Sequence, residues 1–407
     1  MPVTGSITTR FVDEKGLDLG KTLIEKDYLI SVYPNIVNQL DTPMLMGWGS
    51  NSGGRLGDNT TTNKSSPVQT IAYGNNWKIM SRNSATTACV KTDGTLWLWG
   101  ANNLGNLGDN TTTNRSSPVQ TVAFGTTWKQ VSCGYAFSGG SGFTACVKTD
   151  GTLWTWGSNS YGQLGDNTTT NRSSPVQTVA FGTNWLQVYC GYRYMAAIKT
   201  DGTLWTWGRN NIGQLGDNTN TNRSSPVQTV AFGTNWKQVS CGQYGMSAIK
   251  KDGTLWSWGW NVLGEIGDNT STARSSPVQT IAFGTNWITV NCGSSVTAAI
   301  KTDGTLWCWG GNASGQLGDN TTTDRSSPVQ TVTFGTNWKL VSSGNGHVGA
   351  IKTDGTLWLW GFGGSGRLGD NTTTSRSSPV QTVIFGNNWK QVSCGYGDTF
   401  AIKDGDF

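Results

Sequence analysis

Residues 196–208 read AAIKTDGTLWTWG, and this stretch decides the fold. Two short runs of alternating side chains flank Asp201-Gly202, a dipeptide typical of tight hairpin turns. A third run opens at Trp185, and a fourth run begins at Pro226 after a long polar loop. We therefore expect four antiparallel strands, at residues 185–188, 195–199, 203–207 and 226–230.

The same unit recurs along the chain. Its Trp-Gly pair begins at Trp48, Trp99, Trp156, Trp207, Trp258, Trp309 and Trp360, at intervals of 51 residues apart from one of 57. Units of this length without 3.6-residue periodicity are typical of β-propeller blades. The repeat begins at a third strand, residues 43–48, and ends after a second strand, Ala401–Lys403. We predict an all-β, seven-bladed propeller over residues 44–407, closed by its N- and C-terminal strands.

The residues expected to build the core are few and large. There are 56 glycines and 21 tryptophans among 407 residues, and 20 of the tryptophans follow the repeat. They are expected to pack between blades. Five of the eight cysteines share one repeat position, where the other two units have Arg82 and Ser343. Equivalent positions around a ring are too far apart to bridge, so we expect small buried thiols, with neither disulfides nor a metal site.

Several functional classes are excluded on composition and motifs. The net charge of +5 is spread along the chain, which argues against nucleic acid as a partner. No run of 18 apolar residues and no secretory signal occurs, so neither a membrane span nor export is expected. Phosphate-binding, hydrolase and zinc-protease motifs are absent, and we expect no enzyme, catalytic residue, cofactor or metal. The single histidine, His347, is expected to be an ordinary surface residue of a loop.

An acidic position and a basic position recur in the polar loop of every unit. The aspartates suit capping of the turn better than calcium binding, because they lack a dense alternating pattern of acids. We expect each aspartate to pair with the basic residue that follows it. The aspartates are Asp58, Asp109, Asp166, Asp217, Asp268, Asp319 and Asp370, and the basic residues are Lys64, Arg115, Arg172, Arg223, Arg274, Arg325 and Arg376.

The motif GSNSYGQLG at residues 157–165, with the later Ser-Pro-Val, resembles the regulator-of-chromosome-condensation repeat family. The resemblance covers residues 44–407 and implies a seven-bladed propeller. That family includes exchange factors for small GTPases, a secreted β-lactamase inhibitor and many scaffolds, so the fold alone does not determine a function. The exchange factors' β-wedge has no counterpart here, since the one insertion is the Gly/Ser-rich stretch 137–143. The near-identical repeats, such as residues 172–185, are also similar to virion proteins of marine bacteriophages.

Comparison of the units with one another separates constant from variable loops. The loops between first and second strands and those between third and fourth strands vary, and in an up-and-down meander both emerge on one face. Binding loops on a rigid scaffold diverge in this way, and Tyr, Trp and Arg are common in recognition surfaces. Drift in loops without a task is the alternative. The candidate binding residues are Tyr135, Phe137, Phe143, Tyr161, Tyr192, Arg193, Tyr194, Arg209, Tyr244, Trp260, Phe362 and Tyr396.

Residues 1–43 belong to no repeat and are too apolar for a solvated tail. We expect this arm to dock into another subunit, with folding back onto the propeller as the alternative. Its expected anchors are Phe11, Leu23, Ile24, Tyr28, Leu29, Val32 and Tyr33.

These observations predict a binding or structural protein. The first hypothesis is a phage virion component, assembled in the host cytoplasm, whose arm contacts other virion subunits and whose variable face recognises a protein or glycan. The alternative is a soluble cytoplasmic scaffold or inhibitor that binds a protein, including a GTPase-regulator-like role.

Overall fold

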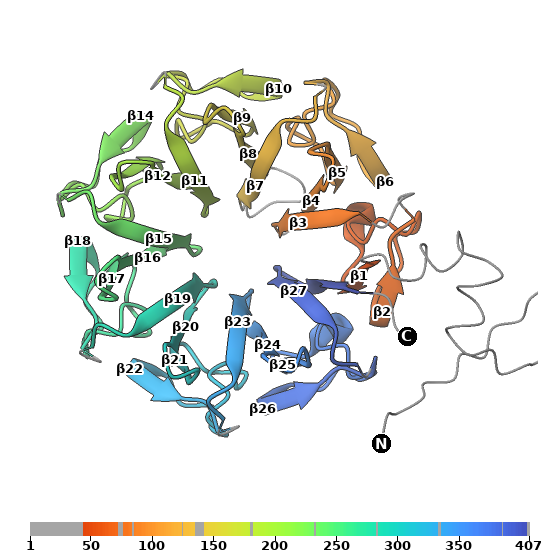
Figure 1. Cartoon of the computed structure of the whole chain (residues 1–407), viewed down its shortest axis with the longest axis vertical. Helices are drawn as coiled ribbons and strands as arrows, with labels where there is room; N and C mark the ends of the chain where they lie inside the picture. Colours follow the sequence, from red (N-terminus) through yellow and green to blue (C-terminus); the bar gives the residue numbers. More distant parts are fainter. Residues whose placement is uncertain are drawn as a thin grey trace, which may run out of the picture.

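The computed structural model describes residues 44–71, 76–83, 85–123, 125–134, 142–179, 182–231, 233–281, 284–332, 335–384 and 386–404. In this part of the chain, seven four-stranded antiparallel sheets surround a central axis (Figure 1). The predicted all-β, seven-bladed propeller is confirmed. None of the described segments contains a helix long and apolar enough to span a membrane.

Each blade has four strands, which lie side by side in order from the axis outward. The innermost strands are β3 (Trp77–Arg82), β7 (Trp128–Gly134), β11 (Trp185–Cys190), β15 (Trp236–Cys241), β19 (Trp287–Cys292), β23 (Trp338–Ser343) and β27 (Trp389–Cys394). The second strands are β4 (Thr86–Lys91), β8 (Phe143–Lys148), β12 (Tyr194–Lys199), β16 (Gly245–Lys250), β20 (Val296–Lys301), β24 (His347–Lys352) and β28 (Asp398–Lys403). The third strands are β5 (Leu96–Gly100), β9 (Leu153–Gly157), β13 (Leu204–Gly208), β17 (Leu255–Gly259), β21 (Leu306–Gly310), β25 (Leu357–Gly361) and β1 (Met44–Gly49). The outermost strands are β6 (Arg115–Gln120), β10 (Arg172–Gln177), β14 (Arg223–Gln228), β18 (Arg274–Gln279), β22 (Arg325–Gln330), β26 (Arg376–Gln381) and β2 (Lys64–Gln69).

We number the blades 1 to 6 from β3–β6 to β23–β26. The seventh, or closing, blade combines both ends of the repeat region, in the order β2-β1-β28-β27. Met44 pairs with Lys403 and Gly49 pairs with Asp398 across its middle. The ring is therefore closed by hydrogen bonds between N- and C-terminal strands, as predicted.

The outermost strands begin three residues before the expected position. In blade 3, β14 starts at Arg223, and Pro226 lies inside the strand. Proline is tolerated there because β14 is an edge strand, so its missing N–H leaves no ladder hydrogen bond unmade. Gly208 pairs with Arg223, and the register shifts before Thr206 pairs with Val227.

The tryptophan of each Trp-Gly pair seals the interface with the preceding blade. Trp207 is fully buried, and its indole Nε1 donates a hydrogen bond to the carbonyl of Gln163, 3.0 Å away in blade 2. The other six make the same bond at 2.9–3.0 Å. The predicted packing between blades is thus confirmed for these seven residues.

The tryptophans two positions earlier have a different environment. Trp205 is half-buried, and its Nε1 donates to the Thr203 hydroxyl at 2.9 Å. The ammonium of Lys199 lies 4.4 Å from the ring of Trp205 and 4.9 Å from that of Trp185. This cation between two indoles recurs in blades 1 to 6 and stabilises the end of each second strand.

The cysteines are free thiols, as expected, and all but the half-buried Cys292 are buried. The five at the repeat position lie at the ends of the innermost strands. Neighbouring blades meet there: the Cys190 backbone N–H donates to the Ser132 hydroxyl at 2.9 Å, and Cys394 bonds Ser342 in the same way. Burial raises the pKa of the Cys133 thiol to about 12. These thiols pack as small apolar groups and are poor nucleophiles.

A network of side chains centred on an asparagine makes the polar loop before the outermost strand rigid in every blade except blade 6, where Gly363 replaces the asparagine. In blade 3 the Asn210 amide donates to Asp217 at 2.9 Å and its oxygen accepts from the Leu215 N–H at 2.9 Å. Asp217 also caps the Thr219 N–H and pairs with Arg223 at 2.9 Å. Burial alone would raise the pKa of Asp217, but the hydrogen bonds from Thr219 and Arg223 outweigh it and lower that pKa. Capping and pairing are confirmed around the ring, at 2.8–3.6 Å for the ion pairs.

Candidate binding face

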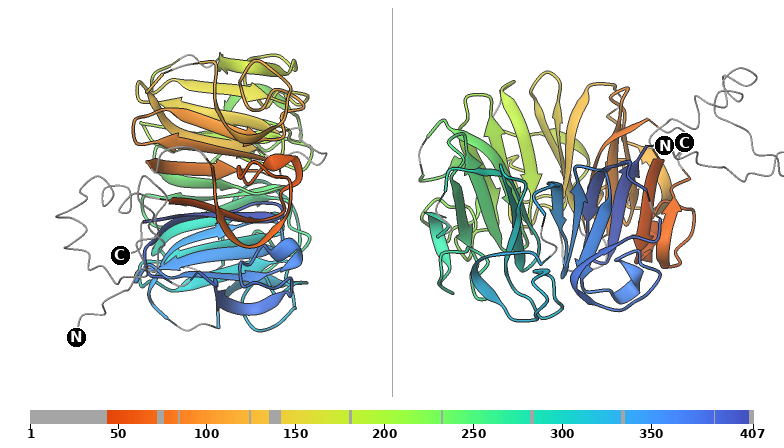
Figure 2. Two further views of the ribbon diagram at one scale, coloured as in Figure 1. Left: turned by 90° about the vertical axis from the view of Figure 1, so that its right-hand side faces the viewer. Right: turned by 60° about the horizontal axis from the view of Figure 1, so that its bottom comes forward.

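The two sets of variable loops meet on one face of the ring. The Arg209 N–H, which opens a third-to-fourth-strand loop, donates to the Arg193 carbonyl in a first-to-second-strand loop at 2.8 Å. The Trp260 N–H bonds the Tyr244 carbonyl in the same way at 3.0 Å. The short turns η1 (Ser52–Gly54) and η2 (Gly364–Gly366) belong to these loops and lie on one side of the disc (Figure 2). We call this side the variable face.

Six variable side chains from blades 2, 3 and 4 form one continuous group on this face. We call it the aromatic–arginine cluster: Tyr161, Tyr192, Arg193, Arg209, Tyr244 and Trp260. All six are among the candidate binding residues that the sequence predicts, and the tertiary structure brings them together.

The two guanidinium groups stack on the tyrosine rings. The Cζ atom of Arg193 lies 5.1 Å from the ring centres of both Tyr161 and Tyr192. Arg209 lies 5.2 Å from Tyr192 and 5.9 Å from Tyr244. Neither arginine is ion-paired with a carboxylate of the described residues, and the buried Arg193 Nε has no hydrogen-bond partner there. Arg209 Nε donates to the Asn211 side-chain oxygen at 2.8 Å, so stacking leaves the terminal Nη groups, and not Nε, available to an incoming ligand.

The aromatic rings continue from this pair toward blade 4. Tyr192 is buried, with 6% of its surface exposed, and it meets Tyr244 edge to face at 5.5 Å. Tyr244 lies 6.2 Å from Trp260, which is 36% exposed. Burial and the nearby Tyr192 raise the pKa of the Tyr244 phenol, against the effect of Arg209. Arg193 is held at φ +63°, in the left-handed region that costs a non-glycine residue energy. The surrounding contacts keep it in the conformation that the stacking requires.

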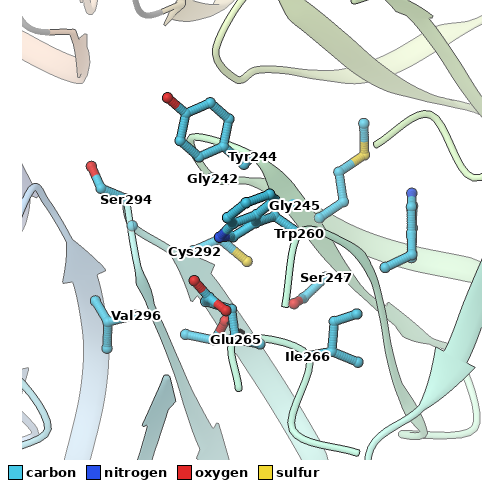
Figure 3. A pocket seen from close by; sticks show the side chains of 14 residues that line it. Gly242, Tyr244, Gly245, Ser247, Trp260, Glu265, Ile266, Cys292, Ser294 and Val296 are labelled. Atoms are coloured by element: carbon cyan, nitrogen blue, oxygen red, sulfur yellow. Dashed lines mark hydrogen bonds between the residues drawn. The ribbon is translucent and has the colours of Figure 1, made fainter. Parts of the chain in front are cut away.

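A small cavity of about 20 Å³ lies beside Trp260, enough for roughly one water molecule. The Glu265 side chain points into this region, below the indole (Figure 3). Burial raises the pKa of Glu265 to about 7. Its Oε2 accepts the Leu263 N–H at 2.9 Å, the bond that Gln163 Oε1 makes with the Tyr161 N–H. Glu265 thus replaces the glutamine of the repeat motif with a titratable acid.

The remaining candidate residues are not part of this cluster. Phe143 and Tyr194 are buried, so their expected place on an exposed surface was wrong. Both open a second strand and turn toward the blade core. The Tyr194 hydroxyl lies 2.9 and 2.7 Å from the carbonyl oxygens of Gly242 and Gly245. Phe362 and Tyr396 are exposed on other blades, and Tyr135 and Phe137 lie outside the described residues.

The expectation for His347 was also wrong. The residue opens β24 and is completely buried. Its Nε2 lies 3.0 Å from the Thr399 hydroxyl, and that hydroxyl donates to the Arg367 carbonyl at 2.8 Å. The imidazole Nε2–H is therefore the donor to Thr399. Burial, with the charges of Arg367 and Arg82, lowers the pKa of His347 well below its usual value.

Comparison with known proteins agrees with this architecture. The model of the RCC1-like domain matches residues 44–401. The chain belongs to the RCC1-like domain family. The chain is also 29% identical to the ultraviolet-B receptor UVR8 of Arabidopsis thaliana over 334 residues, 80% of this chain and 74% of that protein. It is 25% identical to the human E3 ubiquitin-protein ligase HERC2 over 88% of this chain, which spans 8% of HERC2.

Solved structures show the same fold as this RCC1-like propeller. Human WBSCR16 superimposes with a TM-score of 0.79 and 19% identity, over 90% of this chain and all of that one. Prp20p of Saccharomyces cerevisiae, a study of which describes its binding to Gsp1p and histones, superimposes with a TM-score of 0.77 and 17% identity, over 90% and 93%. At these identities the likeness concerns the fold alone.

The comparison of units missed a second group of charged residues in this RCC1-like propeller. Arg82 is buried and ion-paired with Asp398 in the closing blade, and Arg55 and Arg367 lie close by. The available signal was arginine at Arg82, where other units have cysteine or serine, and at Arg55 and Arg367, where they have glutamine, asparagine or glutamate. Along the chain Arg82 is 27 residues from Arg55 and 316 residues from Asp398, so the sequence does not show that they lie close together.

Proposed function

We propose that this RCC1-like propeller is a non-enzymatic binding module that recognises a partner protein through the aromatic–arginine cluster. The observation that carries the proposal is the stacking of Arg193 and Arg209 on tyrosines without any carboxylate partner among the described residues. Aromatic and arginine side chains at the centre of a surface are the usual source of binding energy between proteins. Two guanidinium groups of this kind favour a partner segment that carries carboxylates beside apolar groups.

The rigid loops strengthen this proposal. Asn159 and Asn210 anchor the loops that carry Tyr161 and Arg209, through bonds of 2.9–3.0 Å to Asp166 and Asp217. A surface ordered before binding loses less conformational entropy when the partner arrives.

The comparisons favour the protein-binding alternative over a virion role. The relatives reported above are a receptor, a ubiquitin ligase and a protein described as binding Gsp1p and histones, and none is a virion component. We therefore propose a protein-binding scaffold, with the cytoplasm as its location, which was the alternative to a virion component. A GTPase-regulator-like role is the second candidate, supported by family membership. Accelerated nucleotide release from a small GTPase, lost in Arg209→Ala, would establish it.

Site-specific photo-crosslinking tests the main proposal. A photoreactive amino acid is placed at Trp260 on the variable face, or at Asp201 in the constant turn of the opposite face, and the full chain is expressed in its native cell. We expect one protein to crosslink from position 260 only, and to be lost when Arg209→Ala is added. Equal crosslinking from both faces, or crosslinking indifferent to Arg209→Ala, would contradict the proposal.

Residues 1–43 lie outside the described residues, so their docking role remains a proposal. Its anchors would be the apolar residues of the arm, among them Tyr28 and Leu29. A chain without residues 1–40 should fold normally but lose any self-association or co-purifying subunit in size-exclusion chromatography with light scattering. Unchanged mass and composition would favour an arm folded onto the propeller.

A further inference from the structure

The innermost strand of every blade contains a β-bulge at its second residue. In blade 3 the register shifts between Trp185 and Gln187, so Leu186 has no partner in the second strand. The register shifts at the same position in the other six blades. A bulge of this kind aims its extra side chain away from the ladder. The bulged residues are Lys78, Lys129, Leu186, Lys237, Ile288, Lys339 and Lys390.

The bulged residues surround the axis on the face opposite the variable loops. Each innermost strand lies next to the axis (Figure 1) and ends in a variable loop, so its first residues lie at the opposite face. We call this side the constant face, because its hairpin turns read Asp-Gly in every blade. Lys78 of blade 1 and Lys390 of the closing blade line the same hollow there, of about 380 Å³, together with Leu340 of blade 6.

Five of the bulged residues are exposed lysines, and we call them the lysine ring: Lys78, Lys129, Lys237, Lys339 and Lys390. Lys390 pairs with Asp404 at 2.9 Å, whereas the other four have no ion pair among the described residues. Packing does not require a positive charge at this position, since blade 3 has Leu186 and blade 5 has Ile288, which is 39% exposed.

The constant face has other charges, which balance one another. Each second strand ends in a lysine, and the hairpin turn that follows contains one aspartate. Hydrogen bonds from Thr203, with the charge of Lys199, lower the pKa of Asp201, so that this turn combines one ammonium with one carboxylate. The residues concerned in the seven blades are Lys91 and Asp93, Lys148 and Asp150, Lys199 and Asp201, Lys250 and Asp252, Lys301 and Asp303, Lys352 and Asp354, and Lys403 and Asp404.

The lysine ring therefore gives the constant face an excess of positive charge. Lys251 adds to it beside the turn of blade 4, which makes six positive charges in excess among the described residues of this face, although the whole chain has a net charge of +5. A charge that is spread along the sequence is thus concentrated on one side of the folded protein. Such a surface attracts anionic partners.

Six half-buried tryptophans lie at the edge of the constant face. Each donates its indole N–H to the threonine of the hairpin turn at 2.9–3.0 Å, so the ring reaches the turn with its polar group satisfied. Tryptophan with lysine is the combination that proteins place at a lipid–water interface. The residues are Trp97, Trp154, Trp205, Trp256, Trp307 and Trp358.

Lysines and aliphatic side chains in one ring favour a lipid surface over a soluble polyanion. An ammonium on a flexible stem is a point charge that tolerates many arrangements of phosphate groups, whereas arginine selects a particular geometry. Leu186 and Ile288 interrupt the lysine ring, and aliphatic side chains gain little from a hydrated phosphate backbone. They do gain from entering the boundary between headgroups and acyl chains.

We propose that the constant face binds the surface of a membrane that contains anionic phospholipids, with the lysine ring on the headgroups and Ile288 at the boundary of the acyl chains. In this orientation the aromatic–arginine cluster points away from the membrane and stays accessible to a protein. The lipid surface and the protein partner use opposite faces, so this inference does not rest on the proposed function.

Co-sedimentation of the purified full chain with lipid vesicles tests the proposal. We expect binding to vesicles of phosphatidylcholine with phosphatidylserine, none to vesicles of phosphatidylcholine alone, and a loss of binding as salt screens the charges. Lys129→Gln combined with Lys237→Gln should weaken binding at least about tenfold, since each lysine near an anionic surface contributes about fivefold. The melting temperature should not change, because both side chains are exposed and unpaired.

Two further variants test which face and which chemistry bind the vesicles. Arg193→Gln combined with Arg209→Gln removes the same charge from the variable face and should leave vesicle binding unchanged. Ile288→Ser keeps every charge and should weaken vesicle binding about fivefold, because an apolar contact with lipid is lost. Absence of binding to anionic vesicles, or an equal loss in both double variants, would overturn the proposal. Binding of polyglutamate or duplex DNA without binding of anionic vesicles would assign the lysine ring to a soluble polyanion and overturn it as well.

Discussion

Trp48 donates an indole hydrogen bond to the Arg367 carbonyl oxygen at 2.9 Å, although 319 positions separate the two residues. The same bond joins Trp207 to Gln163 at 3.0 Å across only 44 positions. The interface made by the two ends of the chain is therefore built like an interface made by adjacent repeats. The two contacts differ in the length of chain between their residues, but their hydrogen-bond geometry in the folded protein is the same.

This equivalence gives the first prediction. Trp48→Phe and Trp207→Phe should each destabilise the protein by roughly 2–4 kcal/mol, because each removes a buried hydrogen bond to a carbonyl and leaves a void where the indole was. Chemical denaturation monitored by circular dichroism measures the loss. A much smaller effect of Trp48→Phe would show that the closing blade opens before the rest of the ring unfolds.

Glu265 should make stability depend on pH. Its pKa is raised from 4.5 to about 7 by burial, so ionisation disfavours the folded state. Wild type should thus match Glu265→Gln below pH 4.5, lose stability relative to it as the pH rises to 7, and stay less stable above that. The difference at pH 8 should reach up to about 3 kcal/mol.

Gln316 provides the matched control for Glu265. It occupies the same repeat position and makes the same backbone bond, 2.8 Å from the Ser314 N–H. Gln316→Glu should introduce a similar loss of stability between pH 4.5 and 7. Parallel pH profiles of wild type and Glu265→Gln would show that the Glu265 carboxyl is not buried in solution.

His347 should have the opposite effect. Burial and the charges of Arg367 and Arg82 lower its pKa below 6.5, so the unfolded chain takes up the proton more readily. Stability is expected to fall as the pH drops below 6.5, and His347→Val, with the residue of blade 5, should remove that part of the dependence. Urea denaturation between pH 5 and 7.5 would measure it, and equal slopes for both proteins would refute it.

Substitutions at Tyr194 and Trp260 should have separate effects, the first on the stability of the fold and the second on partner binding. Tyr194→Phe removes a buried hydroxyl that bonds two carbonyl oxygens, and should cost about 1 kcal/mol without changing partner crosslinking. Trp260→Ala should change the melting temperature little, because the indole is 36% exposed, but should weaken partner binding. A large loss of stability in Trp260→Ala would place that residue in the core instead.

Comparison of repeats could locate the strands and the variable loops, but not the exposure of each side chain. Tyr192 and Tyr194 are only two positions apart and both are buried, yet Tyr192 stacks on Arg209 whereas Tyr194 turns into the core. The difference arises because β12 begins at Tyr194, where the side chain turns toward blade 4 and bonds Gly242 and Gly245. The alternation of side chains that predicts direction within a strand does not extend into the loop, so the sequence does not show which way a side chain at the first strand residue points.

The sequence by itself determined the number of blades, their order and the position of the seam. Each blade is specified by local signals, which are the Asp-Gly turn, the Trp-Gly pair and a loop aspartate followed six residues later by Arg or Lys, and these recur at a nearly constant interval. Tertiary structure alone decided that six variable residues form one cluster and that Arg82 meets Asp398. Those contacts join different blades, so they depend on ring closure and on the packing of neighbouring sheets, which no single repeat encodes.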